Sequence, residues 1–276
     1  MKLKLLLVLF LFSISGIFAA QVDTLRVESQ VMKKTISNVV IVPESYQEGT
    51  ENLPVVYLLH GATGDYRDWI SKVPAVKAYA DQYHLMIVCP DGGFTSWYFD
   101  SPVDEAMQYE TYVSRELVQA IDQQYRTIPS PEGRAITGLS MGGHGAFYLA
   151  FRHPEVWGAA GSMSGGLDIR PFPNNWDIAK RLGTYAENKT NWEENTVINL
   201  VYLLDGRNLK LIFDCGVNDF FYDVNKRMHE KLLERNIPHE YVERPGAHNW
   251  EYWTNAVKYH VLFFHDFFES SNEVRQ

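Results

Sequence analysis

Hydrophobic residues occur along the chain in short runs separated by longer amphipathic stretches. Two early runs, residues 24–31 and 34–42, alternate apolar and polar positions, which is typical of an antiparallel pair with one face in water. Five later runs are mostly apolar, as expected for parallel strands covered on both faces. These strands are predicted at residues 54–60, 85–89, 134–138, 158–163 and 210–215, and a last strand is predicted at residues 239–244.

Amphipathic stretches of helical spacing lie between these strands. They predict helices at residues 68–83, 105–125, 142–151, 222–235 and 251–268. This alternation of strands and helices predicts an α/β fold with a mostly parallel, doubly wound sheet of about eight strands and flanking helices. We expect residues 21–276 to form one domain.

One segment interrupts the alternation. Residues 167–204 lie between two predicted core strands, have little strand character, and contain prolines, asparagines, acidic residues, Trp176 and Trp192. We interpret this insertion as a lid or pocket wall, with a surface excursion of no functional role as the alternative.

The N-terminal residues 1–20 have the layout of a secretory signal peptide. Two lysines precede an apolar run at residues 5–12, and small residues follow. The run is shorter than the roughly 20 residues that a membrane-spanning helix needs. We therefore predict cleavage near Ala19 or Ala20, a secreted or periplasmic protein, and no stable membrane insertion.

The charge balance and the cysteines narrow the choice of partners and cross-links. The formal net charge is −9, and loss of Lys2 and Lys4 with the leader would make it −11. An acidic chain without a basic stripe argues against nucleic acid as a partner. Cys89 and Cys215 fall near the ends of predicted strands that are not neighbours in the sheet, so we expect two free, buried thiols.

The candidate nucleophile is Ser140. It is the central residue of Gly138-Leu139-Ser140-Met141-Gly142, which matches the G-x-S-x-G turn between a strand and a helix. Side chains at the two flanking glycines would clash in so tight a turn. An apolar strand precedes the motif and an amphipathic helix follows it, as this turn requires.

A serine nucleophile needs a base, and the base needs an acid to orient it. On this type of fold the three residues follow the chain order serine, acid, histidine. His248 is the candidate base because it lies in a loop between the last strand and the last helix. Asp219, in the loop after the preceding strand, is the preferred acid, and Asp214, within that strand, is the alternative.

The oxyanion of the reaction needs two N–H donors, and three aromatic residues flank the predicted site. The N–H of Met141, which follows the nucleophile, is one expected donor, and the N–H of Ala62, in the Gly-rich turn after residues 54–60, is the other. Trp97, Phe220 and Trp250 are candidates for lining a substrate pocket. The alternative is that these three aromatic residues belong to the core or the rim.

These motifs carry a family resemblance. The segments YLLHGATGDYRDW, VCPDGG, GLSMGGHGA, FDCGVNDF and PGAHNW resemble the esterase D group of α/β-hydrolases over residues 34–268. That group includes S-formylglutathione hydrolases, tributyrin esterases, the acetylxylan and feruloyl esterases of carbohydrate esterase family 1, and antigen 85 mycolyltransferases. The resemblance implies the α/β-hydrolase fold, a Ser140–Asp219–His248 triad, an oxyanion hole of Ala62 and Met141, and no cofactor or metal.

Together these features predict a secreted serine carboxylic-ester hydrolase that works through an acyl-enzyme. The expected substrates are acetyl or feruloyl esters of polysaccharide, or small short-chain acyl esters. An acyltransferase with the same triad is one alternative, and a non-catalytic binding protein on a hydrolase scaffold is another.

Overall fold

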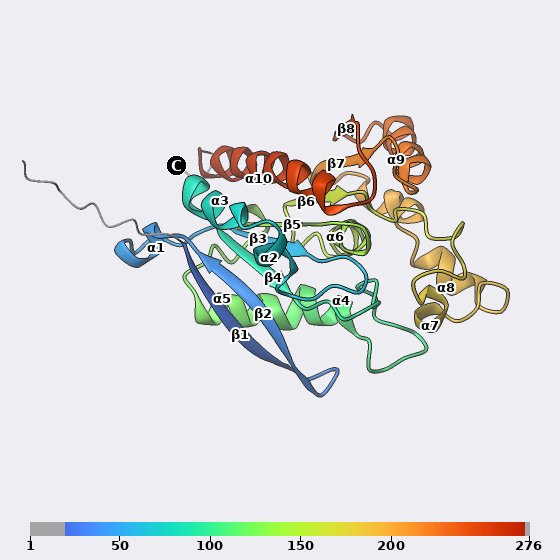
Figure 1. Ribbon diagram of the computed structural model, residues 1–276, viewed down its shortest axis with the longest axis horizontal. Helices are drawn as coiled ribbons and strands as arrows, with labels where there is room; N and C mark the ends of the chain where they lie inside the picture. Colours follow the sequence, from blue (N-terminus) through green and yellow to red (C-terminus); the bar gives the residue numbers. More distant parts are fainter. Residues whose placement is uncertain (1–19, 274–276) are drawn as a thin grey trace, which may run out of the picture.

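An eight-stranded sheet runs through the centre of the molecule (Figure 1). The computed structural model describes residues 20–273, so the predicted signal peptide lies outside the described residues except for Ala20. The strand order is β1-β2-β4-β3-β5-β6-β7-β8. The strands are β1 (Gln21–Ser29), β2 (Lys34–Val42), β3 (Val55–Leu59), β4 (Met86–Pro90), β5 (Arg134–Gly138), β6 (Ala159–Met163), β7 (Lys210–Gly216) and β8 (Glu240–Arg244).

The strand directions confirm the predicted mostly parallel sheet. The β1–β2 pair and the β2–β4 pair are antiparallel, and every pair from β4 to β8 is parallel. Strand β1 begins at Gln21, three residues before the predicted start. It ends at Ser29, because residues 30–33 form the turn into β2, with Lys33 in the left-handed region. Asp81 fixes the start of β1, since its carboxylate accepts hydrogen bonds from the N–H groups of Ala20 and Glu44, both at 2.9 Å.

Helices cover both faces of this sheet, as a doubly wound fold requires (Figure 1). Helices α2, α3 and α10 lie on one face, and η1, α5, α6 and α9 lie on the other. Their bounds are α1 (Ser45–Glu48), α2 (Asp68–Lys72), α3 (Ala75–Tyr83), α4 (Tyr109–Thr111), η1 (Tyr112–Leu117), α5 (Val118–Gln124), η2 (Pro131–Gly133), α6 (Met141–Arg152), α7 (Ile178–Leu182), α8 (Lys189–Glu194), η3 (Val197–Leu204), α9 (Tyr222–Glu234) and α10 (Trp250–Glu273).

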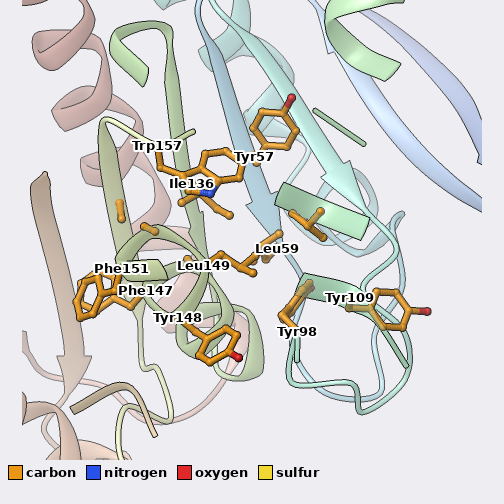
Figure 2. Packing of buried hydrophobic residues seen from close by; sticks show 14 of the residues in the cluster. Tyr57, Leu59, Tyr98, Tyr109, Ile136, Phe147, Tyr148, Leu149, Phe151 and Trp157 are labelled. Carbon is orange, nitrogen blue, oxygen red and sulfur yellow. The ribbon is translucent and has the colours of Figure 1, made fainter. Parts of the chain in front are cut away.

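Alternate residues of the central strands build two hydrophobic cores. In β3, Val56 and Leu58 join the core under α3 and α10, whereas Tyr57 and Leu59 join the core under α6. Figure 2 shows the second core, which holds Tyr57 and Leu59 of β3 together with rings from α6. The ring of Trp157 lies 5.0 Å from that of Tyr57. This two-sided burial explains why the parallel strands are almost wholly apolar in sequence.

Two predicted helices differ from the structure. The helix expected at residues 68–83 is divided, because Pro74 has no N–H to donate and Val73 before it leaves the helical conformation. The helix expected at residues 105–125 begins only at Tyr109, where α4, the π-helix η1 and α5 follow one another.

The insertion at residues 167–204 folds into α7, α8 and η3. Trp192, Ile178 and Leu182 are fully buried in the same core as α6. Arg170 ties the insertion together, since its guanidinium bonds both Asp168 and Glu193 at 2.8–3.0 Å. The segment is therefore packed onto the sheet domain along much of its length.

Two further predictions concern the cysteines and the membrane. Cys89 and Cys215 are buried and free, as predicted, and β3, β5 and β6 lie between their strands. Within residues 20–273, every helix is too short or too polar to cross a bilayer.

Candidate active site

The loops that follow four parallel strands meet at one edge of the sheet. The strands β3, β5, β7 and β8 all end there, because parallel strands have their carboxyl ends on the same side. Ser140 follows β5, Asp219 follows β7, and His248 follows β8. Residues far apart in sequence are in this way brought to one place.

Ser140 lies on a strained turn between β5 and α6. Its φ of 55° and ψ of −115° are unusual for a residue with a Cβ. A Cβ at Gly138 would lie 2.7 Å from the backbone of Gly142, and one at Gly142 would lie 2.6 Å from the carbonyl oxygen of His60. Both flanking glycines are therefore needed sterically, which is the reason given above for the motif.

A continuous hydrogen-bonded chain joins the three predicted catalytic side chains. Ser140 Oγ lies 2.8 Å from His248 Nε2, and His248 Nδ1 lies 2.8 Å from Asp219 Oδ2. Asp219 Oδ1 also accepts a hydrogen bond from the Phe221 N–H at 2.8 Å. The aspartate side chain is fully buried, so its negative charge is directed at the imidazole and one backbone amide.

Aromatic rings surround the imidazole of His248. The Phe220 ring lies 4.1 Å away, tilted by 37°, and the Trp253 ring lies 4.9 Å away at a right angle. Phe221 adds an edge contact at 5.4 Å. The His248 side chain is only 14% exposed, so the ring is held in place and partly shielded from water.

The loop after β3 abuts the nucleophile. A Cβ at Gly61 would lie 3.5 Å from Ser140 Cβ, so Ala62 follows the point of closest approach. His60 fixes this loop, since its Nδ1–H donates to the Gly61 carbonyl (2.7 Å) and its Nε2 accepts from the Gly92 N–H (2.8 Å). Burial lowers the pKa of His60, which favours this neutral, two-bonded form.

The second predicted oxyanion donor is the first N–H of helix α6. Because Met141 begins the helix, its amide has no acceptor within α6, and it lies at the positive end of the helix dipole. His144, one turn further on, is fully buried, and burial lowers its pKa to about 4. That histidine is neutral near pH 7 and adds no charge beside the nucleophile.

A cavity of about 410 Å³ opens over Ser140. Residues 61–64, Leu139, Ser140 and His248 line it on one side, and side chains from α2, α10, the Asp219 loop and the insertion form its walls. These wall residues are Asp68, Lys72, Trp176, Phe220, Trp250 and Trp253. Predicted residues Ala62, Phe220 and Trp250 therefore lie at the cavity.

Trp97 was expected to line the pocket, and this prediction is wrong. Its side chain is 1% exposed and does not reach the cavity. Its indole lies against His144 at 5.2 Å, and its Nε1–H donates to the carbonyl of Trp176 at 3.0 Å. Trp97 and Tyr98, in the loop after β4, both have positive φ, and the bond to Trp176 lets the Trp97 ring support the wall from behind.

Four wall residues are absent from the predicted site. They are Asp68, Lys72 and Trp253, together with Trp176, which the sequence places only in the insertion. Trp253 follows Trp250 by one helical turn, so helical spacing could have placed both rings on one face of α10. Lys72, bonded to Asp68 at 3.1 Å and lying over the Trp250 ring at 4.7 Å, has no such local indication.

In the part of the chain that the structure describes, no cluster of three or more histidine, cysteine or carboxylate side chains could hold a metal ion. A hydroxyl, an imidazole and a carboxylate in hydrogen-bonded sequence are suited to nucleophilic catalysis.

A mostly parallel, doubly wound sheet with a serine on the sharp turn after its central strand β5 defines an α/β-hydrolase. Within that class the chain belongs to the Esterase family, whose family model matches residues 29–264. The predicted fold class and family resemblance are thereby confirmed.

Three known proteins are similar to this chain in sequence or structure. An esterase of Mycobacterium tuberculosis is 28% identical over 76% of this chain, and the chain spans about half (51%) of that relative's length. The diacylglycerol acyltransferase/mycolyltransferase Ag85A of Mycobacterium bovis is 28% identical over 86% of this chain and 79% of its own length. A solved ferulic acid esterase superposes with a TM-score of 0.78 at 29% identity, covering 91% of this chain and all of that structure.

Proposed function

We propose that this protein is a serine ester hydrolase that works through a covalent acyl-enzyme on Ser140. The observation that carries this proposal is the hydrogen-bonded sequence Ser140 Oγ, His248 Nε2, His248 Nδ1, Asp219 Oδ2, with both links at 2.8 Å. Membership of the Esterase family supports the same reaction class.

The proposed reaction has two halves. His248 Nε2 takes the proton of Ser140 as the oxygen attacks the ester carbonyl, and the amides of Ala62 and Met141 stabilise the oxyanion. The C–O bond to the alcohol then breaks, and His248 returns the proton to the leaving oxygen. Water, deprotonated by His248, attacks the acyl-enzyme and releases the acid and free Ser140.

Asp219 has a supporting part in both halves. Its carboxylate accepts the Nδ1–H of His248, so Nε2 is left as the acceptor that faces Ser140. The same negative charge stabilises the imidazolium that forms during each step. The rings of Phe220 and Trp253 restrict how the imidazole can turn.

For the substrate we propose feruloyl or acetyl esters of polysaccharide, or small short-chain acyl esters. Similarity to a ferulic acid esterase and a cavity walled by aromatic side chains support the aromatic acyl group. Export through the signal peptide proposed at residues 1–20 would bring the enzyme to such substrates outside the cytoplasm.

The experiment compares hydrolysis of p-nitrophenyl acetate, butyrate and octanoate and of methyl ferulate by the wild type and by Ser140→Ala. We expect turnover of at least one ester by the wild type and a loss of about 10⁴-fold or more in the variant. Circular dichroism and thermal unfolding check that the variant is folded. A folded wild type that hydrolyses none of these esters would contradict the proposal and favour a binding protein.

Acyl transfer is a second candidate, because the 28% identical relative Ag85A is named an acyltransferase. The two reactions share the first half and differ in whether water or an alcohol attacks the acyl-enzyme. Adding glycerol to the p-nitrophenyl butyrate assay and measuring butyrate and glyceryl butyrate separates them. Hydrolysis predicts mainly butyrate at millimolar glycerol, whereas a dominant glyceryl ester would establish transfer.

A further inference from the structure

Trp176 has a backbone conformation that is unusual for a bulky residue. Its φ is 46°, and that of the following Asp177 is 57°, so two successive residues with a Cβ lie in the left-handed region. That region favours glycine and is an outlier for large side chains. Strained positions of this kind persist only where surrounding contacts enforce them, and they concentrate at functional sites.

The loop after β4 supplies the contacts that enforce this conformation. The buried Trp97 donates its Nε1–H to the carbonyl of Trp176 at 3.0 Å. Thr95 donates its hydroxyl to the Asp177 carboxylate at 3.1 Å, and Lys180 lies 2.9 Å from the same side chain. The carbonyl of Trp176 and the side chain of Asp177 are thus both held by the loop after β4.

The ring of Trp176 is the outer member of an aromatic stack that ends on the proposed base. It lies 5.5 Å from the Phe220 ring and nearly parallel to it, with 20° between the planes. Phe220 in turn lies 4.1 Å from His248. Phe172 and Phe221 touch Trp176 from other directions, at 5.5 and 5.3 Å.

This packing makes the stack a wall rather than an open platform. One face of the indole is covered by Phe220, and the neighbouring phenylalanines restrict its movement, so a ligand cannot slide between the rings. Trp176 nevertheless lines the cavity that holds Ser140 and His248. A substrate group that extends toward the insertion would meet the edge of this wall.

We propose that Trp176 is a specificity-determining residue that closes the end of the cavity beyond Phe220 and limits the length of the ester group lying there. The inference rests on the proposed ester hydrolysis and adds the residue that sets its size limit. The group concerned is an apolar chain, because the rings of Trp176 and Phe220 line that end of the cavity.

The test is the relative kcat/KM for long and short esters in Trp176→Gly. Glycine accepts the positive φ, so the substitution removes the ring and relieves the backbone strain together. Each methylene that gains apolar contact is worth about fourfold in affinity. We expect the octanoate-to-acetate ratio of p-nitrophenyl esters to rise at least about tenfold. A parallel series with octyl and ethyl acetate probes the alcohol side.

Two further variants serve as controls. Trp176→Phe keeps a smaller ring and should raise the ratio by less than Trp176→Gly does, and it decides the matter if the glycine variant does not fold. Phe94→Ala removes an aromatic ring that is 61% exposed and does not line the cavity, so the ratio should stay at the wild-type value.

The outcomes are distinct. A raised ratio in the acyl series or in the alcohol series supports the proposal and shows which part of the ester faces Trp176. Unchanged ratios in both series, with a folded and active Trp176→Gly or Trp176→Phe, overturn it while leaving the hydrolase intact. Failure of the wild type to hydrolyse any ester would instead be a failure of the proposed function.

Discussion

At the scale of single residues, two aspartates near the end of β7 have different surroundings. Asp219 faces His248 in the loop, as described above. Asp214, the alternative acid predicted from the sequence, points toward helix α10. Its Oδ2 lies 3.0 Å from His260 Nε2 and 3.1 Å from Arg244 Nη1, far from any contact with His248.

Substituting each aspartate by asparagine should distinguish a catalytic role of Asp219 from a structural role of Asp214. Asp219→Asn should lower kcat by about 10⁴-fold, because the amide does not hold the imidazole in the required tautomer. Asp214→Asn should instead cost about 3 kcal/mol in the free energy of unfolding, since it leaves the guanidinium of Arg244, whose side chain is 16% exposed, without its carboxylate partner. Ester turnover and urea denaturation measure the two effects.

The reversed result would reassign the acid. If Asp214→Asn lost turnover while Asp219→Asn kept it, Asp214 would be the orienting group and the observed contact of Asp219 would be structural. Equal loss of stability in both variants without loss of turnover would also contradict the assignment.

The individual residues of the site differ in how far the sequence could predict them. Ser140 sits in a local motif whose steric logic lies within five residues, and His248 and Asp219 follow from chain order. Trp97 was misplaced because burial depends on how the loop after β4 folds back. Trp176 depends on contacts with residues some 80 positions earlier, which no local pattern records.

At the scale of elements, helix α6 joins the nucleophile to the core. Ser140 precedes its first residue, and His144 follows one turn later among the rings of Trp97, Phe99 and Tyr148. A fully buried, neutral imidazole so close to the site links the stability of the helix to pH.

Stability should therefore fall on acidification. The folded-state pKa of His144, about 4, lies below the unfolded value of about 6.5. The unfolded chain binds the extra proton between these values, so this contribution is full above pH 6.5 and is lost as pH falls toward 4. The difference corresponds to about 3 kcal/mol.

Urea denaturation of wild type and His144→Gln at pH 7 and pH 4.5 checks this prediction. The difference in unfolding free energy between the two pH values should be smaller in the variant, by roughly 2–3 kcal/mol. An identical pH dependence in both proteins would mean that His144 does not titrate in this way.

Element existence was predictable, and element boundaries were less so. The strands from β3 to β7 were predictable as apolar runs, because burial on both faces leaves a strong compositional mark, and β1 and β2 were predictable from alternation of apolar and polar residues. Pro74 marks the break between α2 and α3 in the sequence, whereas the predicted helix at residues 68–83 continues through this proline. The π-helix η1 has no such mark, since its hydrogen-bonding pattern follows from packing.

At the scale of the whole molecule, the insertion at residues 167–204 is integrated with the hydrolase domain. Its side chains join the core of α6, its Arg170 bridges two of its own acids, and its Trp176 contacts the loop after β4. We interpret it as a fixed pocket wall rather than a lid.

The rate of amide hydrogen exchange distinguishes a fixed pocket wall from a mobile lid. We expect amides of α7 and η3 to exchange with protection close to that of α6, because Ile178, Leu182 and Val201 are buried in the same core as α6. The exposed residues 50–52 provide a fast-exchanging reference. Exchange of α7 and η3 as fast as that segment, slowed on binding of an ester analogue, would indicate a lid.

The overall architecture was the most predictable feature, because alternation of strands and helices leaves few topologies. The position of the insertion along the chain could also be seen. Its depth of packing could not, since Ile178, Leu182 and Trp192 look like ordinary residues of a polar, proline-containing segment until the core around them is assembled.

The hydrogen bond from Ala20 to Asp81 makes the position of signal-peptide cleavage structurally important. Under the proposed export, cleavage between Ala19 and Ala20 would create an α-ammonium group 2.9 Å from that carboxylate. The hydrogen bond from a neutral amide would become an ion pair, located immediately before the edge strand β1. Cleavage one residue later would delete this anchor, so the choice of scissile bond would decide whether the mature protein has its N-terminus fastened.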